Sequence, residues 1–246
     1  MKPLKFLILL FYYDRPEMVK NALNSIKRTS YKDYHIAFID DGSSTPGKPI
    51  VEELLDSEEL SKVTFYNTNQ SPSDKKTQGG SIFGKYANIA TDKNPSDITL
   101  MLCDDDALTP GYLEYLNEFF HLNSEVNHCY SKVLFYDPSK EDYLESREHT
   151  PYTHVGSTFL NLNIYTTPVN PIGKFDASQV AWRTKCNIEF PFPRTRALDS
   201  IIYTQLGDNH GLCYPTGIFG QCKGAFEDQL GNRWKDGKDE FIINTK

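Results

Sequence analysis

The chain has few cysteines and no excess of basic residues, and each of these deficits excludes a class of protein. Five cysteines occur among 246 residues, at irregular spacing and without a CxxC pair. This pattern gives no readable zinc site, and the odd number indicates reduced thiols in a cytoplasmic protein. The formal net charge is −7. A nucleic-acid groove requires a basic surface, so no nucleic-acid partner is expected.

The sequence also lacks an apolar run long enough to span a bilayer. Residues 1–11 combine a basic start with an apolar run, as a signal peptide does, but the run continues into Tyr12-Tyr13-Asp14-Arg15-Pro16 without a small-residue cleavage site. We interpret this run as a first buried strand. We therefore expect no transmembrane segment, while peripheral association with a membrane stays open.

Strand and helix patterns alternate through the first half of the chain. Short apolar runs predict buried strands, and apolar residues at helical spacing predict helices between them. After the first strand, the predicted strands are Ile36–Ile39, Val63–Tyr66 and Ile98–Leu102, and the predicted helices are Pro16–Lys27, Pro49–Leu55 and Ile82–Ala90. A further helix is expected to begin with Thr109 as its cap and Pro110 as its first residue. The alternation predicts an α/β fold with a mostly parallel central sheet flanked by helices.

The pattern changes after residue 122. Runs of β-branched and aromatic residues at Cys129–Tyr136 and Val155–Tyr165 predict a small antiparallel addition, and a helix is expected near Arg196–Leu206. The tail from Gly207 onward gives only a weak pattern. We expect one domain over residues 1–246, in which residues 1–122 form a nucleotide-binding half and residues 123–246 a second half with the C-terminal tail.

Polar or acidic turns follow three of the predicted strands: Tyr12–Arg15, Asp40-Asp41 and Asp104-Asp105-Asp106. The carboxyl ends of parallel strands share one edge of a sheet, so these turns should converge on one crevice. Adjacent carboxylates repel one another unless a cation lies between them or water solvates them fully. For Asp104-Asp105-Asp106 taken alone, a solvated acidic turn is the better explanation, but the convergence of three turns favours a divalent metal site.

Short motifs in this order resemble those of the GT-A-fold glycosyltransferases of the family-2 type, which use a nucleotide-sugar donor. Tyr13–Glu17 resembles that family's YNRPE turn, Asp40–Ser43 its DDGS motif, and Asp104–Asp106 with Pro110 its DxDD…P segment. Ile172–Asp176 resembles a GxFD turn, and Leu198-Asp199 lies where an ED motif would be. The matches extend from about Leu4 to Asp199.

The resemblance implies a role for particular residues. Tyr13 would flank the base, Asp41 would accept a hydrogen bond from it, uracil being the commonest base, and Asp104 would contact the ribose. The full set implied to bind the donor is Phe11, Tyr13, Arg15, Asp41, Lys85 and Asp104. Lys85 or Lys76 would add positive charge near the diphosphate, although a solvated lysine is an equally good reading of either.

The resemblance also implies a metal and a general base. Asp105 and Asp106 would bind Mn²⁺ or Mg²⁺, which prefer oxygen ligands, and the cation would neutralise charge on the departing diphosphate. Asp199 would take the proton from an acceptor hydroxyl, in a displacement that inverts the anomeric carbon. The competing reading of Asp199 is an ordinary carboxylate at a helix start.

Two positions depart from the family pattern. Cys103 replaces the usual first Asp of the metal motif, which predicts weaker cation binding that depends more on Asp105 and Asp106. Gln221-Cys222-Lys223-Gly224 stands where a QHxG segment often supplies a late His ligand. A thiol is a poor partner for Mg²⁺ and a passable one for Mn²⁺, so Cys222 is given no metal role.

The sequence thus predicts a metal-dependent, inverting glycosyltransferase that moves a sugar from a UDP-linked donor to a hydroxyl of a glycan or glycoconjugate. The resemblance implies that residues 123–246 form the acceptor-binding half and tail. Trp182 and Trp234 could line the acceptor pocket there or could equally belong to the core. The alternatives are a carbohydrate-binding module on the same fold that has lost turnover, and a sugar-nucleotide nucleotidyltransferase. The latter normally carries a Gly-rich phosphate loop after its first strand, and Tyr12–Pro16 is not one.

Overall fold

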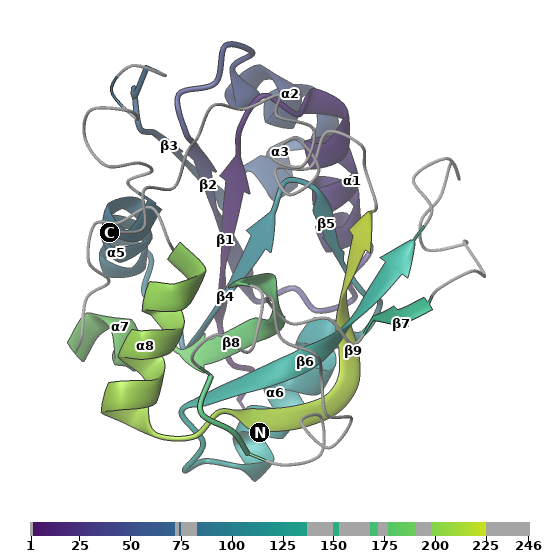
Figure 1. Cartoon of the computed structure of the whole chain (residues 1–246). Coiled ribbons are helices and arrows are strands. Elements are labelled where there is room, and N and C mark those ends of the chain that lie inside the picture. Colours follow the sequence, from purple (N-terminus) through teal and green to yellow (C-terminus); the bar gives the residue numbers. More distant parts are fainter. Residues whose placement is uncertain are drawn as a thin grey trace.

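In the part of the chain that the structure describes, the strands form one mixed sheet. The computed structural model describes residues 2–71, 74, 83–136, 150–152, 168–171, 177–189 and 198–224. The strands in this part of the chain are β1 (Phe6–Tyr12), β2 (Tyr34–Asp40), β3 (Val63–Asn67), β4 (Ile98–Cys103), β5 (Asp106–Leu108), β6 (His128–Tyr136), β7 (Thr150–Tyr152), β8 (Val180–Arg183) and β9 (Tyr214–Gly224). Their order across the sheet is β3-β2-β1-β4-β8-β6-β9-β5, with β7 paired to β6 (Figure 1).

The helices lie on both faces of this sheet. Those described are α1 (Pro16–Lys27), α2 (Gly47–Leu54), α3 (Ser57–Leu60), α5 (Phe83–Lys93), α6 (Tyr112–Leu122), α7 (Lys185–Glu189) and α8 (Leu198–His210), with a 3₁₀ turn, η2, at Ala177–Gln179. Figure 1 shows α7 and α8 in front of the sheet and α1 behind it. The predicted α/β architecture is confirmed.

The first four strands in the order, β3-β2-β1-β4, pair in parallel. Parallel neighbours need a crossover connection, and α1, α2 and α5 are carried by those connections. Each predicted strand of the first half lies within an observed one, so the apolar runs located the strands correctly. At β1 the run is buried from its first residue to its last, as expected for a strand covered on both faces.

Alternate residues of β1 divide between two apolar cores. Ile8 and Leu10 point to the face where α1, α2 and α6 pack. Leu7 and Leu9 point to the opposite face, where α5, α7 and α8 pack. This alternation follows from the two-residue repeat of a strand. It fixes the direction of every side chain at the strand ends, where the candidate site lies.

Helix α1 follows β1 directly and holds the first loop in position. Pro16 occupies the first turn, and Arg15 is the N-cap residue without a side-chain capping bond. A proline suits this position because its missing N–H would have no helical partner there. Val19, Leu23 and Ile26 recur at helical spacing and are fully buried against the sheet. A guanidinium carries only donors, so the Arg15 side chain could not cap the helix N–H groups.

The second half of the sheet is mainly antiparallel, as predicted. Strand β8 pairs antiparallel with β4 and with β6, and β7 pairs antiparallel with β6. Strand β9 was not predicted: it pairs parallel with β6 and antiparallel with β5. The strand expected at Val155–Tyr165 lies outside the described residues.

The prediction for the start of α6 was wrong. The short strand β5 intervenes after β4, and α6 begins at Tyr112 with Gly111 as its N-cap. Gly111 has φ +76°, a left-handed conformation that glycine adopts without penalty. The Thr109 hydroxyl does not cap the helix; it donates to the Phe219 carbonyl at 2.6 Å. A contact with a distant strand has displaced the local capping pattern.

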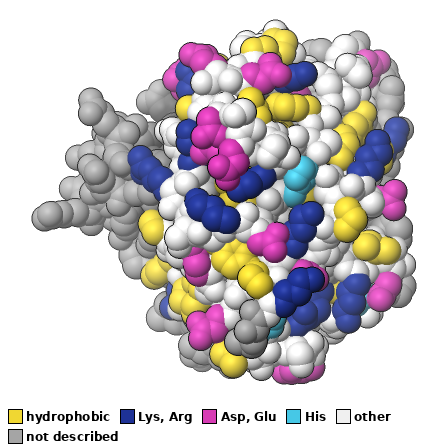
Figure 2. All heavy atoms as spheres, turned by 180° about the vertical axis from the view of Figure 1, so that it is seen from behind, with side chains coloured by type: hydrophobic (Ala, Val, Ile, Leu, Met, Phe, Trp, Pro, Cys, Tyr) yellow, Lys and Arg dark blue, Asp and Glu magenta, His cyan; other side chains and the backbone are white. Residues whose placement is uncertain are grey.

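The face seen from behind carries charges of both signs. Figure 2 shows Lys and Arg side chains interspersed with Asp and Glu side chains and with small apolar areas. Three adjacent carboxylates, those of Asp104, Asp105 and Asp106, lie where β4 ends and β5 begins. Among the described residues, no helix is both long and apolar enough to cross a membrane.

Candidate active site

The loops after β1, β2 and β4 meet at one edge of the sheet. In the strand register Tyr12 lies beside Asp40, and Phe11 lies beside Cys103. The backbone N–H of Asp41 then donates to the Tyr12 carbonyl at 3.0 Å. The convergence of the three turns that the sequence predicted is therefore found. Side chains about 90 residues apart in sequence contact one another here.

Arg15 joins the first turn to the acidic segment. One of its guanidinium nitrogens, Nη1, donates to Asp104 Oδ1 at 3.1 Å and to Asp105 Oδ2 at 3.0 Å. The three side chains are only 7–12% exposed. An ion pair at this degree of burial is screened weakly by water. Arg15 therefore supplies, from within the chain, the positive charge that adjacent carboxylates require.

Asp104 is the most buried of the paired carboxylates. Its Oδ2 accepts a hydrogen bond from the Tyr13 backbone N–H at 2.8 Å. Burial raises the pKa of the Asp104 carboxyl to about 7, and the charge of Asp105 adds to the rise, whereas Arg15 and the Tyr13 N–H lower it. The ion pair and the hydrogen bond thus hold a carboxylate in surroundings that disfavour its charge.

The two aspartates after β2 have different partners. Asp40 accepts backbone hydrogen bonds from Ser43 at 2.8 Å and from Gly47 at 2.9 Å, so it shapes the loop that leads into α2. Asp41 instead accepts a hydrogen bond from the Thr68 hydroxyl at 3.1 Å, and both side chains are buried. Asp40 therefore has a structural role in the loop, whereas the Asp41 carboxylate faces the end of β3.

Gly42 allows the loop after β3 to approach Asp41. Its φ of +70° favours glycine, and a Cβ at this position would lie 2.2 Å from the Gln70 carbonyl oxygen. The Gln70 N–H in turn approaches the Thr68 hydroxyl at 3.4 Å. Because Thr68 receives this N–H, its own hydroxyl proton is directed to Asp41. Sequence reasoning missed Thr68, and the polar residues that end β3 were the available signal.

Three ligand-type atoms gather where β4 ends. The Sγ of Cys103 and one carboxylate oxygen each of Asp105 and Asp106 lie within 4.8 Å of one another. Asp106 is 1% exposed, the Asp105 side chain is 12% exposed, and Cys103 is half-buried. The structure therefore brings the two predicted metal ligands together, with the Cys103 sulfur beside them. Two carboxylate oxygens suit Mn²⁺ and Mg²⁺, and a thiol suits the first better than the second.

Cys222 lies beside this group without belonging to it. In the pairing of β5 with β9 it faces Ala107, the neighbour of Asp106. Burial raises the pKa of the Cys222 thiol to about 12, and the Asp106 charge contributes to the rise. The segment that resembles QHxG is thus next to the acidic cluster, although its second residue is a buried thiol.

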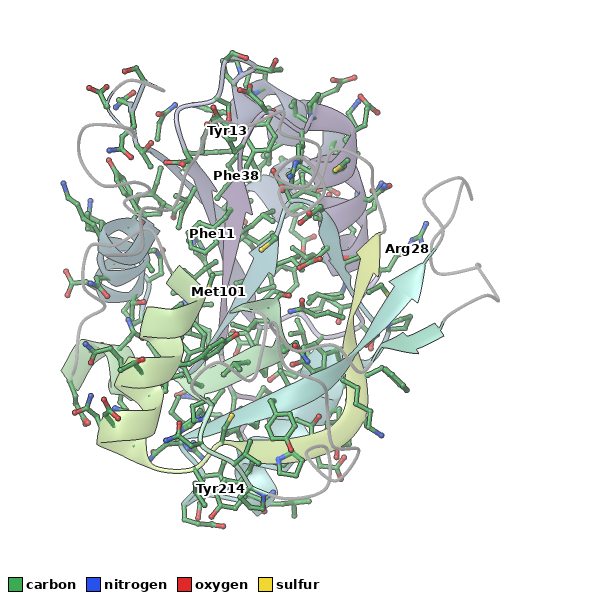
Figure 3. The ribbon with its side chains drawn as sticks, in the orientation of Figure 1. Phe11, Tyr13, Arg28, Phe38, Met101 and Tyr214 are labelled. Atoms are coloured by element: carbon green, nitrogen blue, oxygen red, sulfur yellow. The ribbon has the colours of Figure 1, made fainter. Side chains whose placement is uncertain are left out.

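The aromatic residues expected near the base lie along β1. Figure 3 shows Phe11 on the strand and Tyr13 beyond it toward the carboxyl edge. Phe11 is 5% exposed and belongs to the core under α5 and α8. Tyr13 is half-buried. Lys85 is exposed on α5, with its Nζ 5.9 Å from the centre of the Tyr86 ring.

The acceptor side of the site is only partly described. Asp199 is the second residue of α8. In Figure 1, α8 runs downward from its first turn to the connection with β9, so that first turn is at the end of the helix nearer the carboxyl ends of the parallel strands. Its side chain is outside the description. Lys76, Trp234 and the GxFD-like turn at Ile172–Asp176 also lie outside the described residues. Trp182 is fully buried and donates to Asn187 Oδ1 at 3.0 Å, so it belongs to the core and offers no surface to a sugar.

This parallel sheet with its antiparallel extension, and the acidic edge at the ends of β1, β2 and β4, define a GT-A fold. A sequence model of the family described as glycosyl transferase family 2 matches residues 8–182. The chain belongs to this family. The resemblance read from the short motifs is therefore confirmed.

Solved structures with the same fold carry sugar nucleotides. S. aureus TarS 1–349 in complex with UDP-GlcNAc has a TM-score of 0.62 at 15% identity, over 92% of this chain and 60% of that one. The mannosyltransferase PcManGT from Pyrobaculum calidifontis, in complex with GDP-Man and Mn²⁺, has a TM-score of 0.62 at 12% identity, over 96% of this chain and 60% of that one. The chain thus spans about 60% of the length of these structures. Among curated protein sequences, none is significantly similar to it.

Proposed function

We propose that this chain is a metal-dependent, inverting glycosyltransferase. Its donor is a nucleoside-diphosphate sugar, UDP-linked by preference, and its acceptor is a hydroxyl group of a glycan or glycoconjugate. Family membership and fold support sugar transfer in general. The observation that carries the finer proposal is the meeting of Asp41, the Arg15–Asp104 pair and the Asp105–Asp106 pair at one sheet edge.

Asp41 is the residue proposed to read the base. Its buried carboxylate can accept from an imide N–H of uracil, which an apolar turn could not do. Guanine also carries an N–H donor on its pairing edge, and the related structures contain both UDP-GlcNAc and GDP-Man. We therefore base the preference for UDP on uracil being the commonest base among the donors of this family. The Thr68 hydroxyl would fix the orientation of Asp41 in either case.

Asp104 and Arg15 would hold the next parts of the donor. Asp104 would accept from a ribose hydroxyl, and Arg15, which already bridges Asp104 and Asp105, would share its charge with the diphosphate. Tyr13 lies beyond the end of the same strand as a flanking group for the base. Phe11 is better suited to support the base-binding edge from the core than to touch the donor.

Asp105 and Asp106 would hold the divalent cation, Mn²⁺ or Mg²⁺. The fit rests on their oxygens lying together with the Cys103 sulfur and on the preference of these cations for carboxylates. When bound, the cation would neutralise the charge that develops on the departing diphosphate. Asp105 also accepts a hydrogen bond from Arg15, so its carboxylate would contact both the cation and the Arg15 guanidinium.

Asp199 is proposed as the general base. Its position in the first turn of α8 supports this role, because that turn lies at the end of the helix nearer the strand ends. It would take the proton from the acceptor hydroxyl as the oxygen attacks the anomeric carbon opposite the diphosphate. We also propose a cytoplasmic location. It is supported by the five cysteines, which all lie in the described part of the chain and form no disulfide there.

The test is turnover with a panel of nucleotide sugars. The purified chain is incubated with each donor and Mn²⁺, and the released nucleoside diphosphate is measured with and without oligosaccharide acceptors. The proposal expects release from a UDP-linked donor, loss of release with EDTA, and loss of metal-dependent donor binding in Asp105→Ala. Unchanged nucleotide affinity of Asp105→Ala in Mn²⁺ would remove that residue from the role.

A second function is favoured by the departures from the family pattern. Cys103 in the metal motif and a buried thiol at the late-His position are the changes expected if the fold had become a carbohydrate-binding module. Glycan binding in the same panel, with no diphosphate released from any donor, would support that function over transfer.

A further inference from the structure

Cys103 ends β4 and takes part in the same cluster as the proposed metal ligands. It pairs with Phe11 in the strand register, so its position is set by the centre of the sheet rather than by a loose loop. Its sulfur and the oxygens of Asp105 and Asp106 lie within 4.8 Å of one another. The sequence alone suggested that cysteine here weakens the site, because a carboxylate is missing.

The spacing is close to what one cation requires. Two ligands of one ion are separated by at most the sum of their bond lengths, about 4.4 Å for a sulfur at ~2.3 Å and an oxygen at ~2.1 Å. Small side-chain adjustments would bring the atoms of Cys103, Asp105 and Asp106 to a common ion. The Cys103 sulfur is therefore placed where it can itself bind the cation in place of the Asp that the family usually has at this position.

Sulfur changes which cation the site selects. Mg²⁺ demands oxygen ligands and gives up water reluctantly, whereas thiolates favour softer ions. We infer that Cys103 is a ligand that makes this site select Mn²⁺ over Mg²⁺ and admit the thiophilic ions Zn²⁺ and Cd²⁺. The inference rests on the proposed metal site of the transferase. On binding, the S–H bond breaks, a sulfur–metal bond forms, and the proton leaves to solvent.

The remaining cysteines allow a matched control. Cys129, Cys186, Cys213 and Cys222 are all at most 1% exposed, whereas Cys103 is half-buried. Cys222 is the strictest comparison because it lies next to Asp106 and yet is not one of the three clustered residues. A sulfur ligand from Cys222 would be the closest rival explanation of any metal–thiolate signal.

The experiment is a titration of the donor-free protein with Cd²⁺, followed through the ultraviolet charge-transfer absorption of a cadmium–thiolate bond. The wild-type chain and Cys222→Ser should show a band that saturates near one Cd²⁺ per chain. Cys103→Ser should lack it. A wild-type chain without the band, a band retained in Cys103→Ser, or a band lost in Cys222→Ser would overturn the inference.

A second variant measures selectivity directly. Free Mn²⁺ is followed by its electron paramagnetic resonance signal while Mg²⁺ competes for the site. The wild-type chain should prefer Mn²⁺ by ~10-fold or more, and Cys103→Asp, which restores an all-oxygen ligand set, should reduce that preference several-fold. Equal preference in the two proteins contradicts the inference.

Failure of this inference is separable from failure of the proposed function. Saturable Mn²⁺ binding without a cadmium–thiolate band removes Cys103 from the ligands and leaves the transferase proposal intact. A Cys103-dependent band in a chain that releases no diphosphate from any donor supports the inference and contradicts transfer.

Discussion

Replacement of Arg15 by methionine should destabilise the protein and unbalance the charge of the site. Arg15 is the positive group seen to bridge Asp104 and Asp105, and all three side chains are 7–12% exposed. Arg15→Met keeps much of the side-chain length and removes only the charge and the donors. The Asp104 and Asp105 carboxylates would then remain buried without the positive charge of the Arg15 guanidinium.

The size of the effect follows from burial. Removing one partner of a buried ion pair costs about 3–5 kcal/mol, because the other charge is left uncompensated. The two contacts share one nitrogen, so their contributions do not add, and we expect about 3 kcal/mol rather than twice that. A typical domain has a stability of about 5–15 kcal/mol, so this is a large fraction of the total.

The assay is equilibrium unfolding in urea, with and without Mn²⁺. Lys20→Met is the matched control, since Lys20 pairs with an exposed Glu17 at 2.9 Å and its loss should leave the midpoint unchanged. Mn²⁺ should raise the midpoint of Arg15→Met more than that of the wild type, because a divalent cation restores the missing charge. An Arg15→Met variant as stable as the wild type would refute the reasoning.

Three further predictions test separate parts of the account. Asp199→Asn should spare donor binding and lower transfer by ~100-fold, the scale of losing a general base; near-normal transfer in a kinetic assay places the base elsewhere. Thr68→Val should weaken UDP binding by ~10-fold through loss of its bond to Asp41, while Thr68→Ser retains it, as calorimetry can measure; equal affinities would dismiss the bond. Burial lowers the pKa of His128 to about 4. In the unfolded chain its pKa is about 6.5, so the unfolded state binds a proton more readily than the folded state between these two values. The free energy of unfolding should therefore fall by about 3 kcal/mol as the pH drops from above 6.5 toward 4, and it should fall less in His128→Gln. Parallel profiles of the two proteins would contradict this.

The parallel half of the fold could be predicted because its signals are local. Four apolar runs and the helical spacing of Val19, Leu23 and Ile26 located strands and helices without knowledge of their partners. Strand β9 could not be found in this way. It contains glycines at 217 and 220, and it is formed by pairing with β6 and β5, which are distant in sequence. The start of α6 was mispredicted for the same reason, since Thr109 bonds to β9 instead of capping the helix.

The meeting of the acidic turns could be predicted, but the contacts within it could not. Strand ends share an edge by topology, so Asp41 and Asp105 were expected in one crevice. From the sequence alone, a metal ion or water was expected to hold the adjacent carboxylates together. The structure adds a third means, Arg15, whose guanidinium lies 89 residues away in sequence from Asp104. No local pattern records such a contact.

The most direct test of a shared site for base, diphosphate and cation is calorimetric binding of UDP and of uridine, each with and without Mn²⁺. The account predicts that Mn²⁺ strengthens the binding of UDP and not of uridine, that Asp105→Ala abolishes this gain, and that Asp41→Asn weakens both ligands. Mn²⁺-strengthened UDP binding that persists in Asp105→Ala, or uridine binding that is indifferent to Asp41→Asn, would contradict it.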